Sequence, residues 1–393
     1  MAAFQFRIIL EFGVESQTEP QLTDVARLQV AIEKQLQAEG LPTKSNKKPP
    51  RKVYNRDESD SESEGEGRDE LLNFPEYVRN FTEQKYDFWE VSKAEDQNLT
   101  FSQDLPESNG VGYAVSVSTP LLDTTDESIK VIERVCNMLR SKHKTFFWNS
   151  AMVPQVIISK VGGYSHQDVK NFLALVWTFE NHWVRRQGIR SLTTIYRRGE
   201  NCKTTARNAD YTESNPTTPL EQLDKIFARR TSNKVVRLVM HPNLYGTQIY
   251  DLCQLYTPIG RKYGSTPGII FEQHEATLDP VAIRNWLKLC LGMVQFTRED
   301  NPIDVPAYLR SHAEDAQYNV IDIIKDMGLP EQAIYYKRVV DQRAADKIII
   351  EQTVDAVQNE LEHMSFEQPL SDNDSDYCYF PKDDHYLDRQ YFL

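Results

Sequence analysis

Hydrophobic and polar residues alternate at the beginning of the chain, which is typical of a strand with one buried face. Phe4, Phe6, Ile8 and Leu10 are each separated by one residue, and alternate side chains of a strand point to opposite faces. Other short runs rich in β-branched and aromatic residues, bounded by polar segments, predict further strands. The expected strands cover residues 4–15, 86–91, 112–118, 156–158, 234–240 and 268–272.

Between these runs, apolar residues recur every three or four positions, which is the spacing of one helix face. Four of these segments begin with a recognisable cap. The caps are Thr18 with Pro20, Thr124-x-x-Glu127, Ser165-x-x-Asp168, and Asp279 followed by Pro280. They predict helices up to residue 36, over 129–139, over 165–186 and over 280–297, and residues 302–364 are also expected to be mainly helical.

The order of these elements predicts an α+β fold. Strands that are separated by helices of variable length, and that mostly alternate in hydrophobicity, favour an antiparallel sheet. We expect helices on one face of the sheet, a cleft along the other face, and a helical C-terminal extension. Accordingly, we expect a main domain over residues 1–300, an extension over 301–364 and an acidic disordered tail over 365–393.

Charge is concentrated in two segments outside the expected core. The formal net charge is −13, of which residues 57–70 carry about −7 and residues 367–393 about −5. The remainder is near neutral, so the chain lacks the basic surface of a general nucleic-acid binder. Residues 44–70 contain few apolar residues and predict a disordered insert. The basic run 44–52 could serve as a nuclear localisation signal, although a solvated linker is the more common role of such a run.

Cysteine usage and hydropathy indicate an intracellular protein without a membrane partner. The five cysteines are scattered, are odd in number and lack CxxC spacing, which is typical of reduced thiols rather than of disulfides or a zinc site. No run of about 18 apolar residues is present that could cross a membrane, and the N-terminus lacks the pattern of a signal peptide. We therefore expect a cytoplasmic location, or a nuclear one through residues 44–52.

The segment Gly268–Pro280, GIIFEQHEATLDP, contains the chemistry that is easiest to interpret. Side chains alternate along its predicted strand, so we expect Ile270, Glu272 and His274 to share one face. The segment resembles the amidoligase family, whose members are carboxylate–amine ligases related to glutamine synthetase and glutamate–cysteine ligase. In that family the positions of Ile270 and Glu272 hold glutamate and arginine.

Weaker similarities to the same family extend over about residues 4–297. The family's first strand carries two acids spaced by two, and here either Glu11 or Glu15 fills one of these positions, with the second acid lost. Ser116 stands in the place of a glutamate, and Gln155 and Ile157 stand in the places of two histidines. Asp96 lies in a segment similar to a conserved family element. Arg198 and Asn201 resemble an element near a bound carboxylate or phosphate.

The resemblance implies two alternative functions. The first is an ATP- and Mg²⁺-dependent ligase that forms an amide bond, with a carboxylate or amine of a peptide or protein as substrate. Its catalytic residues would be Glu15, Glu272 and His274, and Arg198 and Asn201 would bind the cofactor. Its metal ligands would be Glu15 and Asp96. The second is a degenerate member that keeps the fold as a binding or interaction module, and the substituted cleft positions favour it. A lone histidine near a strand end is more often structural than catalytic, which also applies to His274.

Overall fold

The computed structural model of the protein describes about half of the chain. The described ranges are 4–15, 25–43, 87–93, 112–146, 154–185, 218–239, 250–251, 268–272, 274, 277–315, 317–342 and 345. The predicted insert 44–70 and the predicted tail 365–393 lie outside these ranges. By internal contacts the chain divides into residues 1–341 and 342–393, so the expected extension 301–364 spans this division. The elements below all belong to the first unit.

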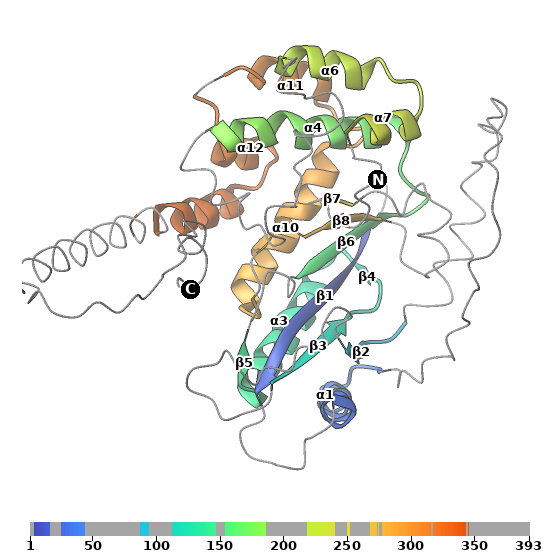
Figure 1. The fold of residues 1–393 in the computed structure, drawn as a ribbon, viewed down its shortest axis with the longest axis vertical. Coiled ribbons are helices and arrows are strands. Elements are labelled where there is room, and N and C mark those ends of the chain that lie inside the picture. The colour runs from blue at the N-terminus through green and yellow to red at the C-terminus, as the bar shows by residue number, and fades with distance from the viewer. Residues whose placement is uncertain are drawn as a thin grey trace, which may run out of the picture. The chain divides into compact units, whose positions relative to one another are not determined.

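The centre of this unit is an antiparallel sheet (Figure 1). Its main path is β2 (Glu90–Lys93), β3 (Gly112–Ser118), β1 (Phe4–Glu15), β6 (Gln155–Lys160), β8 (Ile269–Phe271) and β7 (Tyr250–Asp251). Two short strands, β4 (Leu122–Asp123) and β5 (Thr145–Phe146), also pair with β1. The predicted α+β class with an antiparallel sheet is therefore confirmed.

The alternation in β1 divides the sheet into two unlike faces. Its even-numbered residues from Phe4 to Val14 are all at most 4% exposed. Their cross-strand neighbours are also buried and apolar, as in the pairs of Leu10 with Val117 and of Phe6 with Ile158. This hydrophobic face requires cover from other elements, because each buried apolar side chain contributes about 1.5–3 kcal/mol when it is removed from water.

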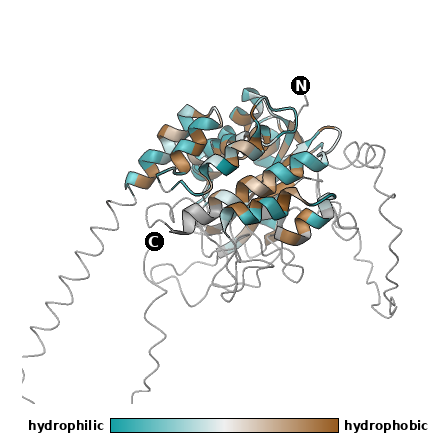
Figure 2. Ribbon diagram, turned by 90° about the horizontal axis from the view of Figure 1, so that it is seen from above, coloured by the Kyte–Doolittle hydropathy of each residue, from teal (hydrophilic) through white to brown (hydrophobic). Residues whose placement is uncertain are grey.

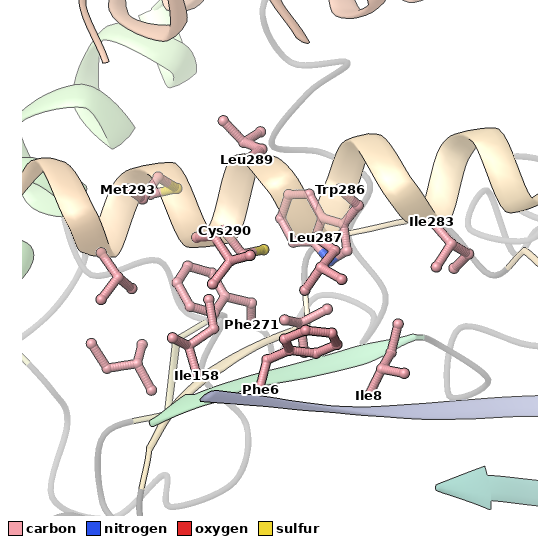
Figure 3. Close-up of a cluster of buried hydrophobic side chains, with 14 of the residues drawn as sticks. Phe6, Ile8, Ile158, Phe271, Ile283, Trp286, Leu287, Leu289, Cys290 and Met293 are labelled. Atoms are coloured by element: carbon pink, nitrogen blue, oxygen red, sulfur yellow. The ribbon is translucent and has the colours of Figure 1, made fainter. Parts of the chain in front are cut away.

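Helices cover that face. α10 (Pro280–Phe296) lies along β1 and β6, and the strand residues Phe6, Ile8, Ile158 and Phe271 point toward it (Figure 3). The ring of Phe271 contacts Trp286 of α10 and Phe172 of α4 (His166–Arg185), with centroid distances of 6.4 and 5.7 Å. Both predicted helices therefore lie on one side of the sheet. α3 (Asp126–Lys142) packs beside α10, and α1 (Val25–Ala38) packs against β2 and β3.

A second layer of helices packs on α4. It contains α6 (Pro219–Phe227), α7 (Ser232–Val239) and α11 (Val305–His312). The chain continues through α12 (Val320–Asp326), and a further helical segment begins at residue 330. Hydrophobic and hydrophilic residues occupy different sides of these helices (Figure 2). None of the helices in the described part of the chain combines the length and the apolar character needed to cross a membrane.

Three local predictions were wrong. The described part of the segment expected as a strand over 234–240, residues 234–239, belongs to α7. Residue 240 lies outside the described ranges. The β-branched residues of this segment favour a strand, but Thr231 caps it as a helix. Val235 and Leu238, three positions apart, are buried on the side that packs against α4. Thr125, not Thr124, caps α3 and accepts a hydrogen bond from Ser128 N. The strand expected over 86–91 begins at Glu90.

Candidate functional site

The face of the sheet opposite the helices is the candidate site. Strand register places three rows of residues across it, and we call this set the second face. The rows are Glu90, Ser118, Ile9 and Gln155; then Ser92, Ser116 and Glu11; then Arg7, Ile157 and Ile270. The second face is thus polar toward β2 and β3 and apolar where β6 meets β8.

An ion pair between Arg7 and Glu90 bridges β1 and β2. Arg7 Nη2 donates to Glu90 Oε2 at 3.1 Å, and Arg7 Nε donates to the backbone carbonyl of Thr119 at 3.1 Å. The Arg7 side chain is 10% exposed and that of Glu90 is 38% exposed. Thr119 is itself fixed, because its hydroxyl accepts from Ile8 N and donates to the carbonyl of Pro120. The guanidinium is therefore held in one orientation, and its charge is offset by a carboxylate.

Sequence reasoning did not select Arg7 or Glu90 as site residues. A signal was present, because Arg7 is a charged residue between two large apolar residues in a predicted strand. A charge at such a position is rarely buried without a partner. The partner could not be identified from sequence, since Glu90 lies 83 positions away.

The first strand carries both candidate carboxylates rather than one. The sequence offers either Glu11 or Glu15 as the acid of this strand, in alternative registers. In the structure both belong to β1, where Glu11 pairs with Ser116 and Glu15 pairs with Gly112. They are four positions apart and therefore have the same strand parity. The acids of the family motif are spaced by two, so the strand does not decide between the two registers, and the choice of Glu11 or Glu15 stays a prediction.

Four positions singled out in the sequence analysis lie on the second face. Ser116, Gln155, Ile157 and Ile270 all belong to the second face. Ile157 and Ile270 are direct cross-strand partners and are 3% and 5% exposed. Arg7 is the partner of Ile157 on the other side. The centre of the face is therefore an isoleucine pair beside a neutralised arginine.

His274 does not share a face with Ile270, in contrast to the sequence expectation. Its ring lies against Trp286 of α10, with 5.5 Å between ring centroids, and the residue is 7% exposed. The strand ends at Phe271, so its alternation does not extend to residue 274. His274 therefore belongs to the side covered by helices, while Glu272 follows β8 directly and is half-buried.

The remaining predicted site residues lie outside the described ranges. These are Asp96, Arg198 and Asn201, and for Glu15 only the backbone is described. Within the described ranges, His, Cys, Asp and Glu side chains form no group of three or more that could hold a metal ion.

Comparison with known proteins identified no relative of this chain. No family model matches the chain, and no curated protein or solved structure is detectably similar to it. The chemistry of the site therefore has to be argued from its own residues.

Proposed function

We propose that this protein is a degenerate member of the amidoligase family that uses the second face as a binding module for a peptide or protein ligand. We also propose that its sheet is arranged as in the catalytic fold of glutamine synthetase and glutamate–cysteine ligase. The observation that carries it is the buried pair of Ile157 and Ile270 beside Arg7.

This pair argues against a nucleotide triphosphate as the ligand. Binding of a triphosphate requires divalent metals held by carboxylates, and cations near the transferred phosphoryl group. The two isoleucines offer neither, and the nearest described cation on the face, Arg7, is engaged with Glu90. A peptide or protein ligand fits better. It would meet the polar part of the second face, where the Glu90 side chain is 38% exposed, and polar contacts are typical of the rim of protein interfaces.

The alternative is an ATP- and Mg²⁺-dependent carboxylate–amine ligase with a rearranged site. One observation favours it. Strand β1 brings both Glu11 and Glu15 into the sheet, while Glu90 lies on the second face. Together with Glu272 and Asp96 they would be the acids available to hold Mg²⁺, with Arg198 and Asn201 toward the phosphate and His274 as a further catalytic candidate.

Thermal stability in the presence of Mg-ATP distinguishes the two functions. Ligand stabilisation follows RT ln(1 + [L]/Kd) and vanishes when Kd far exceeds the ligand concentration. For the binding module we expect no shift of Tm with millimolar Mg-ATP. A clear rise in Tm that is lost in both Glu11→Ala and Glu15→Ala would instead establish the ligase.

A second experiment tests binding directly. Peptides from a random display library are selected on the full chain, and their affinity is then compared with that for Glu90→Gln and for Ile157→Thr. We expect at least a tenfold loss for both variants, since each changes the second face. The matched control is Glu127→Gln, which removes a carboxylate from the exposed pair with Lys130 on α3 and should bind as the wild type does. Peptides that bind all four proteins equally would contradict the proposal.

A further inference from the structure

The turn between α6 and α7 carries a basic sequence followed by a serine. It reads Arg229-Arg230-Thr231-Ser232, and Ser232 is the first residue of α7. Both arginines are exposed, and Thr231 and Ser232 are half-buried. Arginines two and three positions before a serine match the charge pattern that the acidic substrate grooves of basophilic protein kinases select. The turn lies in the outer helical layer, and the second face does not use it.

The hydroxyl of Ser232 faces a histidine of a neighbouring helix. Ser232 Oγ lies 3.0 Å from His166 Nδ1, and His166 Nε2 lies 3.3 Å from the backbone carbonyl of Arg229. A carbonyl can only accept, so Nε2 carries the proton in the neutral ring, and Nδ1 accepts from the serine hydroxyl. The turn is therefore already connected to the first residue of α4 by both nitrogens of one imidazole.

Positive charge gathers around this contact. Lys170, one turn further along α4, donates from Nζ to the carbonyl of Phe227 at 3.1 Å. Burial, and then the charge of Lys170, lower the pKa of His166, and burial also lowers the pKa of Lys170. An added anion would favour the charged form of both side chains, because its negative charge offsets the cost of burying their positive charge. The negative charge of Glu299 raises the pKa of His166 and so opposes the effect of Lys170.

We propose that Ser232 is a phosphorylation site for a basophilic protein kinase, and that the phosphate fastens the α6–α7 turn to the start of α4. The kinase transfers the γ-phosphoryl group of ATP to Ser232 Oγ. The bond between the γ-phosphorus and its bridging oxygen breaks, the Oγ–P bond forms, the hydroxyl proton passes to the kinase's base, and ADP leaves.

The phosphate would be stabilised at this position in two ways. It stands at the first turn of a helix, where backbone N–H groups and the helix dipole favour negative charge. It also adjoins His166, which becomes protonated and donates to a phosphate oxygen, with Lys170 and the exposed Lys234 adding positive charge.

Phosphorylation of the full chain tests the first half of the proposal. The protein is incubated with Mg-ATP and the catalytic domain of a basophilic kinase, and the modified residues are located by mass spectrometry. We expect phosphate at Ser232, none there in Ser232→Ala, and at least a tenfold slower incorporation in the double variant Arg229→Gln/Arg230→Gln. Ser128 is an internal control, because it also lies in the first turn of a helix but follows Asp126 and Glu127.

Two results would overturn the assignment of the site. One is that the kinase modifies a peptide covering residues 226–238 but not Ser232 in the full chain. The folded protein would then make Ser232 inaccessible to the kinase. The other is an unchanged rate in the double arginine variant, because the arginines would then not be the recognition signal.

Thermal unfolding tests the second half. We expect the phosphorylated chain to unfold at a Tm roughly 2 °C higher than the unmodified chain, the shift that one new charge-assisted hydrogen bond produces in a protein of this size. In His166→Gln the same phosphate should give no increase. An equal increase in wild type and His166→Gln, or a decrease in wild type, would refute the proposed fastening of the turn.

Discussion

At the scale of single residues, a buried carboxylate connects three segments near one end of the sheet. Asp168 is 3% exposed and forms an ion pair with Lys160 at the end of β6. It also accepts hydrogen bonds from the backbone N–H groups of Ser165 and Glu299, both at 2.8 Å. Ser165 Oγ accepts in turn from Asp168 N at 3.0 Å, which closes the predicted capping motif. One side chain therefore fixes β6, the start of α4 and the segment after α10.

We expect Asp168→Ala to lower the free energy of unfolding by about 3–5 kcal/mol. The substitution leaves Lys160, which is 14% exposed, as a nearly buried charge without its partner. Urea unfolding followed by circular dichroism measures the change. The control is Asp224→Ala, which breaks an ion pair with Arg310 at the surface and should cost less than about 1 kcal/mol. Similar losses for the two variants would show that Asp168 is not a structural centre.

The two described cysteines should be chemically inert in the folded protein. Burial raises the pKa of the Cys136 thiol to about 12 and raises the pKa of the Cys290 thiol well above its usual value. At pH 8 only about one Cys136 thiol in ten thousand is then ionised. We expect iodoacetamide to leave both residues unmodified in the native protein and to modify both in urea, as measured by mass spectrometry. Rapid modification of either in the native state would contradict their burial.

The same pKa shifts predict a loss of stability at alkaline pH. The unfolded state releases its thiol protons near pH 8.5, while the folded state retains them to much higher pH. The folded state therefore binds more protons above pH 8.5, and the free energy of unfolding decreases as pH rises from there. Cys136→Ser and Cys290→Ser provide the comparison, because removal of a thiol removes its part of this slope.

At the scale of elements, the approach of β8 to β6 depends on a glycine. A Cβ atom added to Gly268 would lie 2.6 Å from the carbonyl oxygen of Ile158 and 2.9 Å from Ile157 Cγ2. The carbonyl belongs to the strand backbone and cannot move without disturbing the pairing of β6 with β8. That pairing brings Ile157 and Ile270 together, so this glycine also shapes the second face.

Gly268→Ala should therefore be more destabilising than Gly292→Ala. At Gly292, in α10, an added Cβ would meet only the end of the Leu329 side chain, which can change rotamer. We expect a loss of about 2 kcal/mol or more for Gly268→Ala, and a smaller loss for Gly292→Ala, where alanine also favours the helix. Thermal unfolding of the two variants gives the comparison. Equal effects would show that the strand can shift to accept the methyl group.

At the scale of the whole molecule, the helices after residue 300 are part of the core. Tyr308 of α11 contacts Phe179 of α4 and Phe296 of α10, with ring centroids 6.2 and 5.1 Å apart. Tyr318 also contacts Phe179, at 5.9 Å. Phe179 and Phe296 are 1% and 4% exposed. A chain that ends at residue 300 would leave both phenylalanines without this cover.

Two truncations test this arrangement. We expect residues 1–341 to unfold in a single cooperative transition at a Tm close to that of the full chain. Residues 1–300 should lose about 3–6 kcal/mol from the exposure of two buried aromatic side chains, and should bind the dye ANS. Equal stability of the two truncations would instead support a domain boundary at residue 300.

The sequence by itself determined most of the elements and which side of each is buried. The alternation of Phe4 to Leu10, and the Asp279–Pro280 start of α10, depend on neighbours in the chain, so local pattern was sufficient to predict them. The antiparallel sheet and its cover of helices on one face followed from the same patterns. Of the candidate site, Ser116, Gln155, Ile157 and Ile270 were singled out by the family resemblance, which stays a hypothesis. Their place on one face comes from strand pairing.

Tertiary structure decided what local pattern could not. The Val- and Leu-rich segment of α7 is helical because α4 offers it a hydrophobic surface at helical spacing, and contacts of this kind override intrinsic preference. The turn of His274 toward Trp286 depends on where β8 ends, and that end is set by pairing with β6 and β7. The pairing of Arg7 with Glu90 joins residues far apart in the chain. Only the register of three strands brings them together, because a strand specifies its own faces but not its neighbours.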